Sequence, residues 1–69
     1  MFIKFADELI NADHARRIWR ESDPPLENVC ITMEDHTLHR LSFDSAEDAD
    51  KAFLKIGQGL CWGSGICEV

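Results

Sequence analysis

Cys61 and Cys67, near the end of this 69-residue chain, are the side chains best suited to chemistry. They bracket the segment Trp62-Gly63-Ser64-Gly65-Ile66 and could close a small disulfide loop. Their spacing matches no common zinc or redox motif. The simpler interpretation is a flexible chain end whose apolar residues pack loosely or reach a neighbouring subunit.

A metal site would need histidines brought together from separate parts of the chain. His36 and His39 fall in one predicted hairpin together with Asp35, whereas His14 belongs to another element. Asp35 and His36 are expected in a turn simply because turns are polar. His39 is expected as a partly buried imidazole with one hydrogen-bonded nitrogen, so neither observation requires a metal. The sequence therefore predicts no metal site and no cofactor.

Catalytic side chains are equally scarce. None of the four serines has a recognisable base nearby in the sequence. The adjacent acids Glu34-Asp35 and Glu47-Asp48 are typical of solvated turns and helix starts, where carboxylates need no catalytic role. We therefore expect a protein that is not an enzyme. The alternative is a small-ligand-binding or enzymatic domain whose site lies at a subunit interface, because so short a chain leaves little room for a pocket.

The segment Arg16-Arg17-Ile18-Trp19-Arg20 is the only dense basic cluster, and its tryptophan could stack on a base. It keeps open a nucleic-acid-associated regulatory function that uses these arginines and Trp19, provided that the arginines share one exposed face. The formal charge of −6 argues against this function, because the summed field repels phosphate. Arginines on a strand of an acidic protein more often pair with its own carboxylates or with those of a partner.

Length and composition, with 45% hydrophobic and 29% charged residues, are those of a single globular domain. No apolar run exceeds three residues, and Asp7 and Glu8 stand where a signal peptide would be apolar. Together with an odd number of cysteines, this pattern favours reduced thiols in the cytoplasm and no membrane insertion. So small a core is only marginally stable, and we therefore expect a homodimer.

Ser45 begins the clearest local pattern in the sequence. Its hydroxyl and the acid Asp48, three residues later, nearly match a capping box, so a helix should begin at Ala46. Apolar residues then recur at spacings of three and four, which predicts one buried stripe. The stripe consists of Ala49, Ala52, Phe53, Ile56 and Leu60. Gly57 and Gly59 interrupt it, so the helix should end between Ile56 and Leu60.

Two alternating segments precede this helix. Every second residue from Val29 to Met33 shares one strand face, and so does every second residue from His39 to Phe43. The two sets can meet in one core only if the connecting loop has an odd number of residues. Asp35-His36-Thr37 fits such a loop, in which one position takes a left-handed conformation that histidine tolerates. The opposite, uncovered face would carry Cys30 and Leu38, and it could carry Trp19, which parity alone does not assign to either face.

The first half of the chain should contain three shorter strands, at residues 2–5, 9–10 and 16–21, which are rich in strand-forming side chains. Asp23-Pro24-Pro25 then breaks regular pairing and separates the two halves, because proline lacks the amide donor. Four to five antiparallel strands before one helix predict an α+β domain with the helix packed across one face of the sheet. We place this domain at residues 1–60 and a carboxyl-terminal tail at residues 61–69.

The segment Leu9-Ile10-Asn11-Ala12-Asp13-His14-Ala15-Arg16-Arg17-Ile18 resembles a pattern of small bacterial regulatory domains, in which an apolar-Ile-Asn sequence opens a tight turn into a strand. FlbD-like flagellar proteins and LytTR DNA-binding domains carry this pattern, with larger aliphatics at the positions of His14 and Ala15. The resemblance implies a strand, a turn and a second strand here. The whole chain is also similar in style to short bacterial proteins of mobile elements, such as integron cassettes and phages.

These observations favour a small, non-enzymatic protein-interaction or adaptor module that forms a homo-oligomer and binds an unidentified protein partner. The acidic residues around the start of the helix would attract a basic partner. The candidate interaction surface consists of Arg16, Arg17, Trp19, Arg20, Cys61, Trp62 and Ile66.

Overall fold

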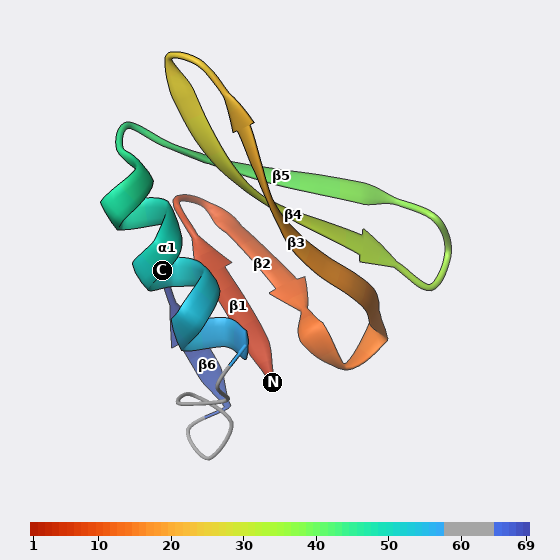
Figure 1. Ribbon diagram of the computed structural model, residues 1–69. Coiled ribbons are helices and arrows are strands. Elements are labelled where there is room, and N and C mark those ends of the chain that lie inside the picture. The colour runs from red at the N-terminus through yellow and green to blue at the C-terminus, as the bar shows by residue number, and fades with distance from the viewer. Residues whose placement is uncertain (58–64) are drawn as a thin grey trace.

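The computed structural model describes residues 1–57 and 65–69, which contain six strands, one α-helix and a short 3₁₀ helix (Figure 1). The strands are β1 (Phe2–Phe5), β2 (Glu8–Asn11), β3 (Ala15–Asp23), β4 (Leu26–Met33), β5 (Leu38–Phe43) and β6 (Ile66–Glu68). Helix α1 spans Ala46–Gly57, and the 3₁₀ helix η1 spans Ala12–His14. The α+β class expected from the sequence is confirmed.

The strands form two three-stranded sheets, whereas the sequence predicted one sheet of four to five strands. The large sheet is antiparallel, in the order β3-β4-β5. The small sheet has the order β2-β1-β6, in which β6 runs parallel to β1. Strand β6 lies in the residues assigned to the tail, so α1 is not the last element of the chain.

Helix α1 begins at Ala46, as the sequence predicts. The hydroxyl of Ser45 accepts a hydrogen bond from the backbone N–H of Asp48 at 3.2 Å, which satisfies a donor that the first turn leaves unpaired. The predicted stripe faces the core, with Ala49, Ala52 and Ile56 buried and Phe53 packed against them. The last helical residue is Gly57, within the predicted range, and Leu60 lies outside the described residues.

The β4–β5 hairpin brings the two predicted apolar sets onto one face, with Val29 opposite Leu41 and Ile31 opposite His39. Its loop has the odd length that the alternation requires, but it begins one residue earlier than predicted. The N–H of Met33 donates to the carbonyl oxygen of Thr37 at 2.9 Å, which leaves residues 34–36 as the loop. His36 takes the left-handed conformation, with φ of 72°.

The turn at Pro24 and Pro25 joins two paired strands instead of separating two halves. Asp23 pairs with Leu26 across the two prolines, so neither proline occupies a position that must donate to the ladder. The resulting β3–β4 hairpin is the longest in the molecule, and its tip projects away from α1 and the small sheet (Figure 1).

One core joins both sheets and the helix. Figure 1 shows α1 beside the small sheet, and Lys55 Nζ donates a hydrogen bond to the carbonyl oxygen of Glu68 at 2.8 Å. Cys67 is fully buried, so its side chain packs in the core and not at a loose chain end. The core consists of Ile3, Ile10, Val29, Ile31, Met33, Leu41, Ala49, Ala52, Ile56 and Cys67.

Candidate interaction face

The large sheet turns one side toward the core and the other side away from α1 and the small sheet. Because side chains alternate along a strand, the residues between the buried core positions point away from the core. Cys30 of β4 lies opposite Trp19 of β3 and Arg40 of β5, and Thr32 lies opposite Arg17 and Leu38. We call this side the outer face of the large sheet. It carries Arg17, Trp19, Glu21, Cys30, Leu38 and Arg40. Cys30 and Leu38 therefore share one face, as the alternation predicts, and the pairing of Trp19 with Cys30 places Trp19 on the same face.

Arg17 and Trp19 form the most distinctive contact on the outer face. They are two residues apart on β3, and the guanidinium carbon of Arg17 lies 4.7 Å from the centroid of the Trp19 ring. A guanidinium over an indole is held by the negative face of the ring, a contact worth about 0.5–1 kcal/mol at an exposed site. Arg17 is exposed and Trp19 is half-buried, so both side chains remain accessible.

Cys30 is fully buried although it belongs to the outer face, because longer side chains cover it. Glu21 of β3 reaches Arg40 of β5 at 3.6 Å and thereby spans the central strand. The Cys30 sulfur lies 3.9 Å from a carboxylate oxygen of Glu21. Asn28, the next outward residue of β4, is also buried, and no residue in the described part of the chain hydrogen-bonds to its side-chain oxygen.

The arginines of the basic cluster do not share one exposed face. Arg20 lies opposite Val29, on the inner side, where its Nε donates a hydrogen bond to Asp50 of α1 at 2.7 Å. That hydrogen bond raises the pKa of the Arg20 guanidinium above its ordinary value. Arg16 falls at a register irregularity between Ala15 and Arg17, where the strand bulges. The condition set for nucleic-acid binding is therefore not met, and Arg20 pairs with the protein's own carboxylate.

Of the remaining predicted surface residues, Ile66 lies on β6, where 54% of its surface is exposed. It is opposite Phe2 of β1, on the outward side of the small sheet. Cys61 and Trp62 lie outside the described residues, and so does any bond between Cys61 and Cys67. Sequence reasoning missed the exposed Phe2 because its strand was predicted without a pairing partner.

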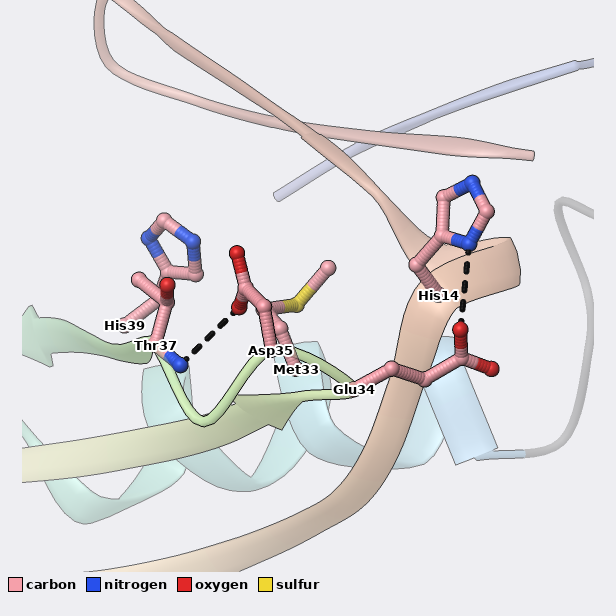
Figure 2. Close-up of a pocket in the computed structure, with 6 residues that line it drawn as sticks. All are labelled: His14, Met33, Glu34, Asp35, Thr37 and His39. Atoms are coloured by element: carbon pink, nitrogen blue, oxygen red, sulfur yellow. Dashed lines mark hydrogen bonds and ion pairs between the residues drawn. The ribbon is translucent and has the colours of Figure 1, made fainter.

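A shallow groove of about 310 Å³ lies where the β4–β5 turn meets η1 (Figure 2). His14 is held there by its own backbone, because its carbonyl oxygen accepts a hydrogen bond from the N–H of Glu34 at 2.8 Å. The His14 Nδ1 also lies 3.4 Å from the Glu34 carboxylate. The groove is lined by His14, Met33, Glu34, Asp35, Thr37 and His39.

The groove provides hydrogen-bonding groups without a ligand set for a metal. Hydrogen bonding to the side chain of Thr37, and then to its backbone N–H, lowers the pKa of the Asp35 carboxyl. The Thr37 nitrogen lies 3.0 Å from Asp35 Oδ1. His39 contacts Glu8 of β2 at 3.7 Å, and His36 does not line the groove. Residues 1–57 and 65–69 contain no group of three histidine, cysteine or acidic side chains placed to hold a metal ion.

Comparison with known proteins gives no relative: no family model, no curated protein and no solved structure matches this chain. In the described part of the chain, no helix is long and apolar enough to cross a membrane.

Proposed function

We propose that this protein is a small, non-enzymatic protein-interaction module that binds a partner through the outer face of the large sheet. The stack of Arg17 on Trp19, at 4.7 Å, carries the proposal. Arginine and tryptophan are enriched among the residues that dominate the energy of protein interfaces, because they combine a large contact area with polar contacts. Both lie on a sheet face that neither α1 nor the small sheet covers.

The charges favour an acidic partner segment. In the described residues, Arg16 and Arg17 form no ion pair, whereas Arg20 and Arg40 pair with carboxylates of this chain. The two unpaired guanidinium groups give β3 a local positive charge on a protein whose formal charge is −6. A carboxylate brought by a partner would complete the Arg17 contact with a bidentate hydrogen bond.

An apolar side chain should accompany that carboxylate. Leu38 lies in the same cross-strand row as Arg17 and is 47% exposed. Together with the Trp19 ring, it offers an apolar surface beside the cation. We therefore infer a partner segment with an aspartate or glutamate next to a leucine, phenylalanine or tryptophan.

The basic partner expected from the helix start has weaker support. Glu47 is paired with Lys51 at 3.3 Å and Asp50 with Arg20 at 2.7 Å, so two of those carboxylates are already neutralised. A nucleic-acid partner would use the same arginines as the proposed protein partner, but Arg20 faces the helix. The net charge of −6 also repels the closely spaced phosphates of a nucleic acid more strongly than a single carboxylate of a peptide.

Selection from a random peptide library on the immobilised full chain tests this proposal. We expect enrichment of peptides that combine acidic and large apolar residues. Fluorescence anisotropy with an enriched peptide should then show that Trp19→Ala and Arg17→Glu each weaken binding tenfold or more, about 1.4 kcal/mol.

Lys51→Glu is the matched control, because it makes the same charge change on an exposed helix position, where the side chain is 72% exposed. It should change the affinity far less than Arg17→Glu does. Enrichment of lysine- and arginine-rich peptides, or equal binding by wild type and Arg17→Glu, would contradict the proposal.

A further inference from the structure

The outward side of the small sheet exposes apolar side chains in register. Phe2 of β1 is 43% exposed and lies directly opposite Ile66 of β6, which is 54% exposed. Leu9, on the neighbouring strand β2, is 63% exposed. Phe2 and Ile66 are neighbours across the ladder, and Leu9 lies opposite Lys4 in the next row. Neighbouring exposed apolar side chains favour the binding of another molecule.

The next outward row of this sheet carries opposite charges. Lys4 of β1 lies opposite Glu68 of β6. In the described residues, neither the Lys4 ammonium nor the Glu68 carboxylate takes part in an ion pair, although the two residues are neighbours across the ladder. Each charge is therefore available to a partner.

The parallel pairing of β1 and β6 makes this patch complementary to itself. A twofold axis parallel to these strands and midway between them would place β1 of one copy over β6 of the other. Rotation about an axis along the strands leaves the direction of each strand unchanged. One strand can therefore take the place of the other only if both run in the same direction, as β1 and β6 do. Phe2 would then face Ile66 of the other copy, and Lys4 would face its Glu68.

We propose that two copies of this chain associate through this surface, which we name the dimer face and define as Phe2, Lys4, Ile66 and Glu68. Such an interface is isologous, so each apolar contact and each ion pair occurs twice. A hollow of about 450 Å³ at its edge, lined in part by Lys4, Leu9 and Ile66, gives the second copy a concave surface to pack against. This inference concerns a different face from the proposed function and does not depend on it.

The size of the dimer face sets the expected strength. Its strands have three and four residues, so the face extends roughly 10–14 Å along the strands and is two strands wide. Stable interfaces bury about 800 Å² per partner. We therefore expect a dimer that dissociates on dilution, in which two ion pairs determine the orientation of the copies.

Sedimentation equilibrium at several concentrations tests the proposal. The mass of the wild-type chain should rise from 7.9 kDa toward twice that value as concentration increases. Lys4→Glu should remain monomeric, because the introduced carboxylate would lie against the carboxylate of Glu68 in the other copy. Glu68→Lys should also remain monomeric, because the introduced ammonium would lie against the ammonium of Lys4 in the other copy. Circular dichroism would establish that both variants are folded.

An equimolar mixture of the two variants is the decisive measurement. In the mixed pair, each charge of one copy meets an opposite charge of the other, so the dimer should return. Lys51→Glu, with the charge change of Lys4→Glu at an exposed helix position, should dimerise like the wild type.

A wild-type chain that stays monomeric at every concentration would overturn the proposal. So would dimers of the separate variants as strong as those of the wild type, or a mixture that stays monomeric. Trp19→Ala should dimerise normally. Loss of the dimer in Trp19→Ala with its retention in Lys4→Glu would move self-association to the outer face of the large sheet and refute the dimer face.

Discussion

Arg20 of β3 donates its Nε–H to the Asp50 carboxylate of α1 at 2.7 Å, and this bond ties the long hairpin to the helix. The same guanidinium donates to the carbonyl oxygen of Asn28 at 2.9 Å, inside the hairpin. Its side chain is 21% exposed, whereas that of Asp50 is 61% exposed. One side chain thus fixes the position of α1 on the strands and withdraws a positive charge from the basic cluster.

Arg20→Ala should therefore destabilise the fold by about 1–2 kcal/mol, since it removes a charge-assisted hydrogen bond whose acceptor is partly solvated. Urea unfolding followed by circular dichroism measures the change. Arg16→Ala is the control, because Arg16 is exposed and forms no ion pair in the described residues. Equal stability of the two variants would show that the Arg20–Asp50 contact contributes nothing.

Two residues of α1 test the packing of the helix. Ile56 is 2% exposed in the core, and Ile56→Ala should cost about 2–5 kcal/mol through lost burial and the cavity it leaves. Leu54 is 52% exposed, so Leu54→Ala should change the free energy of unfolding by less than about 0.5 kcal/mol. Thermal unfolding of both variants should show this order, and the reverse order would mean that the helix presents another face.

Asn28→Val should stabilise the protein, which is unusual for a buried position. The side-chain oxygen of Asn28 is buried without a hydrogen-bond partner in the described residues, at a cost of about 1–3 kcal/mol. Valine removes that oxygen and suits the central strand of a sheet. We expect a gain of about 1 kcal/mol in urea unfolding. A loss of stability would show that the amide is hydrogen-bonded in solution.

Asp35 should contribute stability that disappears in acid. Its folded pKa is below the ordinary 3.8, because the carboxylate accepts hydrogen bonds from Thr37. A carboxyl group whose pKa is lower in the folded state than in the unfolded state stabilises the native state at pH values above the unfolded pKa. This stabilisation is lost as the pH falls through the folded pKa.

Asp35→Asn should consequently be less stable than the wild type at about pH 6, and the difference should disappear as the pH falls below 3.8 and through the folded pKa. Melting temperatures across this range measure it. Asp44→Asn, at another exposed carboxylate, serves as the control for general charge effects. A difference that persists unchanged to the lowest pH would show that the carboxylate charge is not the cause.

Local patterns in the sequence were sufficient for the elements that depend on short-range physics. The cap at Ser45, the buried stripe of α1 and the inward set from Val29 to Met33 follow from hydrogen bonds and periodicities that span a few residues. The same alternation placed Cys30 and Leu38 on one face, whereas parity alone did not assign Trp19. These predictions needed no knowledge of distant partners, and the structure confirms them.

The tertiary structure alone decided which sheets form and which charges are neutralised. Three residues, Ile66–Glu68, give too weak a local signal for a strand, and β6 exists because β1, at the other end of the chain, offers an open edge. Alternation shows which residues of β3 share a face, but not that α1 would bring Asp50 to Arg20. Contacts between distant segments divide the strands into two sheets. They also decide which charged side chains on β1, β3 and β6 remain without an ion pair in the described residues. Such contacts depend on how the whole chain buries its apolar surface, and that outcome is not encoded in any short stretch of residues.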